Sequence, residues 1–214
     1  MDRTPVTGDH VRRAVTLAAE TLGAAPDEAW DRQAGPMDCD CWDAMDHLNN
    51  GLFSYALRLA LPGGYAKGGP TIRWDRPGDL PLPIITDREA GPGRLLAVMV
   101  AMGNLIAASA ETAPPWLRSW HIWGVGDPEG YAAMGVVETL LHTFDIAEGL
   151  GVEWNPPTDL CEAGRARLFP EAPADTDPWE TLLWASGRGD LPGFARRSED
   201  WGWHSAPLDE MPSS

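Results

Sequence analysis

Cysteine is scarce in this chain of 214 residues, and its three copies are odd in number. Two of them, Cys39 and Cys41, lie too close in sequence for a comfortable mutual disulfide. The single residue between them also differs from the two-residue gap that is typical of zinc knuckles. We therefore expect neither a disulfide scaffold nor a cysteine-held zinc ion, and interpret these thiols as ordinary side chains.

Basic residues are half as frequent as acidic ones: 16 Lys and Arg stand against 32 Asp and Glu, for a net charge of -16 and a pI near 4.5. Such a chain repels phosphate backbones and anionic lipid surfaces, so we expect no nucleic-acid partner. The chain also lacks a run of eighteen uncharged apolar residues, and residues 1–14 lack the apolar region of a secretory signal. These absences favour a cytoplasmic protein with no membrane partner.

The chain does contain enough apolar sequence for one core, because 43% of its residues are hydrophobic and 22% are charged. Four long patterns with helical spacing occur before residue 151, each starting near an Asp or Pro and stopping near a Gly or Pro. Asp9 is expected to cap the first. The predicted helices are His10–Leu22, Asp40 or Asp43 to the residue before Pro62, Gly93–Ala110, and Asp127 to Leu150.

These patterns predict an all-α fold, with a four-helix bundle over residues 1–151 and a short, mostly irregular helical extension over residues 152–214 that packs on it. The extension is expected to hold short helices at 158–169 and 177–186. The third long helix is apolar all round, which predicts burial. The Gly- and Pro-rich segment 63–86 is expected to be a loop, with one extended piece at Thr71–Trp74.

Three polar residues interrupt the fourth predicted helix, which is otherwise apolar around most of its circumference: Glu138, His142 and Asp145. At about 100° per residue they lie within a sector roughly 60° wide, so they form one polar stripe. A lone carboxylate in apolar surroundings costs several kcal/mol unless it is paired, protonated or bound to a cation. A divalent metal would meet this requirement, and so would a simple ion pair between Glu138 and His142.

A third metal ligand would have to come from a facing helix, and His47 on the second predicted helix is the candidate. It flanks the apolar stripe of that helix, which favours a position in a crevice between helices; a histidine at the core boundary is the alternative. Two histidines and one carboxylate form a known catalytic set for zinc and for non-haem iron, with open positions for water or substrate. The constellation therefore predicts a metal site at His47, Glu138 and His142.

Two sequence elements carry a resemblance to a known family. The first is Trp42-Asp43-Ala44-Met45-Asp46-His47-Leu48. The second is Glu138-Thr139-Leu140-Leu141-His142-Thr143-Phe144-Asp145-Ile146-Ala147, followed by Leu150-Gly151. Over roughly 11–151 the chain resembles the DinB-like four-helix-bundle metalloproteins, especially the mycothiol-dependent maleylpyruvate isomerase family. The metal triad of that family would fall on His47, Glu138 and His142.

The resemblance implies a zinc ion, or Ni²⁺, Fe²⁺ or Mn²⁺ in its place, whose open position takes the sulfur of a low-molecular-weight thiol such as mycothiol. The thiolate would add to an electrophilic alkene or displace a leaving group. Those isomerases carry a further C-terminal domain, whereas residues 152–214 are expected to form only a short extension. The isomerases often carry basic residues just before the glutamate that corresponds to Glu138, whereas this chain has Ala133, Met134 and Gly135 there. The identity of the thiol cosubstrate is therefore left open.

Five further residues are candidates for supporting roles. Asp145 either orients His142 or faces solvent. His121, in a Trp-rich connector, either shuttles a proton, because imidazole titrates near about pH 6.5, or lies on a surface loop. Trp123 either walls an apolar substrate pocket or plugs an end of the bundle. Arg188 and His204 either hold an acidic substrate from the tail or pack as part of it.

The leading functional hypothesis is a metal-dependent transferase or isomerase that uses a low-molecular-weight thiol and a small electrophilic metabolite. A second hypothesis keeps the metal and drops the thiol, so that metal-bound hydroxide or Lewis-acid activation supports hydrolysis or cyclisation of a small metabolite. A third is a non-catalytic, stress-associated bundle with a structural ion. Small molecules are the expected partners, and a homodimer is compatible with each hypothesis.

Overall fold

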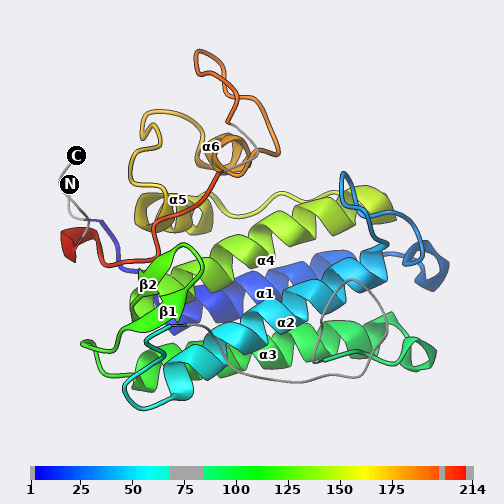
Figure 1. The fold of residues 1–214 in the computed structure, drawn as a ribbon. Coiled ribbons are helices and arrows are strands. Elements are labelled where there is room, and N and C mark those ends of the chain that lie inside the picture. The colour runs from blue at the N-terminus through cyan, green and yellow to red at the C-terminus, as the bar shows by residue number, and fades with distance from the viewer. Residues whose placement is uncertain (1–2, 68–83, 198–200, 211–214) are drawn as a thin grey trace.

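The computed structural model describes residues 3–67, 84–197 and 201–210. Four long helices lie side by side (Figure 1): α1 (Gly8–Leu22), α2 (Cys41–Ala60), α3 (Pro92–Thr112) and α4 (Pro128–Leu150). The shorter elements are helices α5 (Thr158–Leu168) and α6 (Pro178–Ala185), strands β1 (Ser119–His121) and β2 (Gly124–Gly126), and 3-10 turns at Asp27–Ala29, Arg88–Ala90 and Leu208–Glu210. The predicted all-α class is confirmed. The extended piece expected at Thr71–Trp74 lies outside the described residues.

The boundaries of α2 and α4 follow from their capping residues. Asp40 accepts a hydrogen bond from the backbone N–H of Asp43 at 2.8 Å, so the earlier of the two predicted starts of α2 is correct. Asp127 accepts from the N–H of Gly130 at 2.7 Å and begins α4 in the same way. The end of α4 is set by Gly151, whose φ of 72° lies in the left-handed region that glycine adopts without strain.

Two local features differ from the sequence prediction. The N-cap of α1 is Thr7 rather than Asp9, and its backbone N–H donates to Nδ1 of His10 at 3.2 Å, in the manner of a capping box. The Trp-rich connector before α4 is an antiparallel hairpin, in which Ser119 of β1 pairs with Gly126 of β2. This hairpin lies at the same end of the helices as the start of α1 and the 3-10 turn Leu208–Glu210 (Figure 1).

The burial expected for α3 is only partly correct. Its inner face is buried, but Leu105 is 48% exposed and several alanines of the outer face are exposed as well. Most of these outer residues are small, so they count as apolar in composition and still tolerate water. Among the described helices α3 alone is long and apolar enough to cross a membrane by length and composition, which is weak evidence because core helices pass the same test.

The core lies between the four long helices, and α4 is enclosed by it. Helices α1, α2, α3 and α5 all contact α4, so nearly every side chain of α4 is buried, polar ones included. The largest fully buried apolar side chains include Leu22, Met45, Leu48, Leu52, Leu95, Met99, Ile106 and Tyr131. Polar groups on α4 therefore need partners inside the protein.

The C-terminal extension packs on α4, with α5 and α6 on the same side of it (Figure 1). Gly164 of α5 allows a close approach, since a Cβ at this position would lie 2.5 Å from Cγ2 of Val137. Trp154, in the connection to α5, donates from Nε1 to the carbonyl of Leu140 at 3.1 Å. The extension is thus fixed to the helix that carries the polar stripe.

Candidate metal centre

Glu138 and His142 lie one helical turn apart on α4 and contact each other. Nε2 of His142 is 3.0 Å from Oε2 of Glu138, and both side chains are largely enclosed. This contact follows from their spacing, because residues four apart project side by side from a helix. A carboxylate and an imidazole therefore lie in contact inside the fold.

His47 approaches this pair from α2. Its ring meets the ring of His142 edge to face, with centroids 5.1 Å apart and an interplanar angle of 75°. His47 is partly exposed, whereas His142 is buried, so the site reaches the surface on the side of His47. The structure thus brings together the three residues that the sequence proposes as ligands.

Sequence reasoning missed Tyr55, which also touches this group. Its hydroxyl donates to Oε1 of Glu138 at 3.0 Å. Tyr55 lies on α2 two turns beyond His47. It belongs to the apolar stripe of that helix, and such a position indicates a core residue rather than a site residue. The signal that could have found it is this spacing, because residues eight apart project from neighbouring parts of one helix face.

Asp145 and Arg188 form a buried pair behind His142. Asp145 is 0% exposed, and Arg188 donates to it from Nε at 3.0 Å and from Nη2 at 2.7 Å. The alternative of a solvent-facing Asp145 is wrong. The guanidinium of Arg188 is thus already engaged by a carboxylate, and its role as a holder of acidic substrate stays a prediction. Nδ1 of His142 lies 3.4 Å from Oδ2 of Asp145, a long ionic contact.

The charges of this group do not balance without a cation. Two carboxylates, Glu138 and Asp145, face one guanidinium, so neutral histidines leave one excess negative charge. Burial opposes the charged form of Glu138, yet the hydrogen bond from His142 lowers the pKa of this carboxyl. Burial likewise opposes protonation of His142, but its contacts with Asp145 and Glu138 raise its pKa. Either a proton on His142 or a metal ion in its place can supply the missing positive charge.

The donor set fits a divalent metal in chemistry and partly in position. Two ligand atoms that are each about 2.0–2.2 Å from a tetrahedral zinc ion lie about 3.3 to 3.6 Å apart. Nε2 of His142 and Oε2 of Glu138 are 3.0 Å apart, so they would have to separate slightly. Imidazole and carboxylate suit zinc and iron alike. Within the described residues, however, no group of three or more His, Cys, Asp and Glu side chains is arranged to hold an ion as it stands. The metal site therefore stays a prediction.

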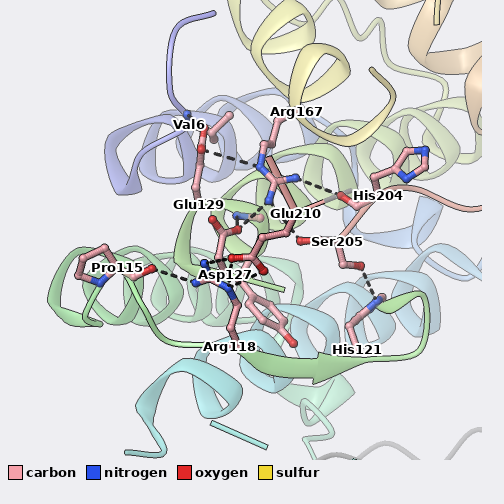
Figure 2. Close-up of polar contacts among 12 residues, drawn as sticks. Val6, Pro115, Arg118, His121, Asp127, Glu129, Arg167, His204, Ser205 and Glu210 are labelled. Atoms are coloured by element: carbon pink, nitrogen blue, oxygen red, sulfur yellow. Dashed lines mark hydrogen bonds and ion pairs between the residues drawn. The ribbon is translucent and has the colours of Figure 1, made fainter. Parts of the chain in front are cut away.

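His121 is buried rather than part of a surface loop. Its ring stacks on Trp203 at 6.0 Å and lies 5.8 Å from the ring of Tyr55. Nδ1 of His121 is 3.3 Å from Oγ of Ser205, a contact that Figure 2 shows. Burial, together with the charge of Arg58, lowers the pKa of His121 to about 4. The role of His121 as a proton shuttle stays a prediction, and the lowered pKa removes the support that an ordinary imidazole pKa gave it.

The buried His121 makes the protein sensitive to acid. Since its pKa falls from about 6.5 in the unfolded chain to about 4 in the fold, the unfolded chain binds more protons in between. Its contribution to stability is complete above pH 6.5 and is lost as the pH falls toward 4. From pH 7.5 to 4.5 the wild type should lose about 2 to 3 kcal/mol more than His121→Phe. Urea unfolding at both pH values measures this, and equal losses in the two proteins would contradict it.

The remaining predicted residues divide between two places. Trp123 is partly exposed and meets Trp203 edge to face at 4.5 Å, in a ring cluster that reaches Tyr55 through His121. The side chain of His204 instead points away from His121 (Figure 2), and its Nε2 is 3.2 Å from Oε2 of Glu171. The structure therefore does not bring His204 to the predicted site, while Trp123 stays a candidate for substrate contact.

Comparisons with known proteins found no relative of this chain. No family model, no curated protein and no solved structure matches the chain. Its function is therefore inferred from the residues of the site.

Proposed function

We propose that this protein is a DinB-like metalloenzyme in which His47, Glu138 and His142 hold one divalent cation, with zinc as the first candidate. The observation that carries the proposal is the enclosed contact between His142 and Glu138 at 3.0 Å, with His47 facing it from another helix. While its histidines are neutral the group carries one excess negative charge, which a divalent cation at this position would balance. Its three donors match the ligands of zinc sites that keep an open position.

The proposed reaction is the transfer or isomerisation of a small electrophilic metabolite by a low-molecular-weight thiol, as the family resemblance implies. A bound divalent ion would lower the pKa of a thiol or water molecule at its open coordination position. The chain itself contributes orientation: Asp145, fixed by Arg188, faces Nδ1 of His142 and leaves Nε2 directed toward Glu138. His47 is partly exposed, so small molecules are expected to reach the metal from its side.

Metal analysis of protein purified without added ions tests whether these three residues bind a metal ion. We expect about one equivalent of metal in the wild type, and less than a tenth of that in His47→Ala and in His142→Ala, because a site that loses one of three ligands binds weakly. His204→Ala is the matched control, since His204 pairs with Glu171, and it should keep its metal. A full equivalent of metal in both His47→Ala and His142→Ala would contradict the proposed triad.

Thermal shifts with mycothiol, bacillithiol and glutathione test the thiol. A stabilisation by one thiol that requires metal supports the transferase or isomerase. The absence of a shift with every thiol, in protein that holds metal, would favour the hydrolase or cyclase instead. A metal site without turnover on broad panels of substrates would leave a non-catalytic bundle.

A further inference from the structure

The hydroxyl of Tyr55 is committed to Glu138. The side chain is buried, with its ring packed 5.7 Å from Tyr131 and 5.8 Å from His121. The single proton of the phenol points to Oε1 of Glu138 at 3.0 Å, because an ionised carboxylate only accepts.

The two oxygens of Glu138 therefore have different surroundings. Oε1 accepts the hydrogen bond from Tyr55, while Oε2 lies 3.0 Å from Nε2 of His142, the nitrogen proposed as a metal ligand. We infer that Tyr55 is a positioning residue, which holds Oε1 so that Glu138 binds the metal through Oε2 alone. This inference rests on the proposed metal site.

A purely structural tyrosine would not need this acceptor, as the neighbouring Tyr131 shows. The hydroxyl of Tyr131 donates its one proton to the backbone carbonyl of Trp120 at 2.8 Å, with the carbonyl of Ser119 as a longer, shared acceptor at 3.2 Å. Both tyrosines are buried and their rings touch, yet only Tyr55 reaches a carboxylate of the site. Tyr131→Phe is therefore a matched control for Tyr55→Phe, because each variant removes one buried hydroxyl.

The experiment loads wild type and both variants with Co²⁺, which reports its coordination number in the visible spectrum, and measures zinc affinity by chelator competition. Tyr55→Phe frees Oε1 for the ion, so we expect the Co²⁺ band to weaken at least twofold as the coordination number rises. Zinc affinity should fall about 10- to 100-fold, the usual effect of losing a partner of a metal ligand. Tyr131→Phe should match the wild type in both measurements.

A Tyr55→Phe protein with the same spectrum and affinity as Tyr131→Phe would overturn the inference and leave the metal site intact. A wild type that binds neither ion would overturn the metal site and the inference together. A crystal structure of the zinc-bound wild type needs no variant. It should show Oε2 alone bound to zinc with Tyr55 still on Oε1, and two bound oxygens of Glu138 would overturn the inference.

Discussion

The Arg188→Met variant is expected to unfold with a free energy about 3 to 5 kcal/mol below that of the wild type. Arg188 provides both short ionic contacts of the fully buried Asp145, at 3.0 and 2.7 Å. Without it, the contact between Asp145 and His142 at 3.4 Å is too long to replace them. A buried carboxylate would remain without a close cation, which is the costly half of a broken ion pair. Chemical denaturation followed by circular dichroism measures the difference.

Two controls separate this effect from the loss of any arginine. Arg196 is 63% exposed and pairs with the exposed Asp190 at 3.4 Å, so Arg196→Met should unfold like the wild type. Adding Asp145→Asn to Arg188→Met removes the unpaired charge and should recover part of the lost stability. A loss in Arg188→Met no larger than that in Arg196→Met would contradict the buried pair.

Most helix positions could be predicted from the sequence because their ends are local chemistry. An Asp before an apolar pattern can accept a free N–H of the first turn, as Asp40 and Asp127 do. A glycine after the pattern can adopt a left-handed conformation, as Gly151 does. Such signals need only a few neighbouring residues, so they do not depend on how the helices pack.

Features that depend on packing could not be predicted in this way. The apolar composition of α3 says nothing about which of its sides meets the other helices, and Leu105 is on the exposed side. The hairpin of β1 and β2 is only three residues per strand, too short for an alternating pattern to stand out. Its surroundings, not its own sequence, enclose His121.

The candidate site also combines contacts that follow from local spacing with contacts that depend on packing. Glu138 and His142 share a helix, so their contact follows from spacing alone. His47 was chosen as the histidine of a facing helix, and its ring does face His142. The partners of these residues come from distant segments: Arg188 reaches Asp145 from 43 residues away, and Tyr55 reaches Glu138 from 83 residues away. The spacing from His47 could have placed Tyr55 on the helix face that carries the site, but no spacing rule connects either residue to its carboxylate partner, so the contacts themselves come from the fold.

The Arg167→Met variant is expected to lower the free energy of unfolding by about 3 to 5 kcal/mol as well. Arg167, on α5, is fully buried, and its guanidinium joins three segments, as Figure 2 shows. It lies 2.7 Å from Oδ1 of Asp127 at the start of α4, and donates to the tail carbonyls of His204 at 3.1 Å and Ser205 at 3.2 Å. Without it, two carbonyls and one carboxylate oxygen lose a buried donor.

Arg165→Met on the same helix is the control, because Arg165 is also buried but touches neither Asp127 nor the tail. Its partners are Glu162, which is 48% exposed and can turn to water, and the carbonyl of Ala172 at 3.1 Å. The tail gives a local test by hydrogen exchange, since the N–H of His204 donates to the carbonyl of Leu168 at 2.8 Å. We expect this N–H to exchange faster in Arg167→Met than in Arg165→Met, and equal exchange would show that Arg167 does not hold the tail. Faster exchange would mean that one guanidinium keeps the tail, and with it Trp203, over His121.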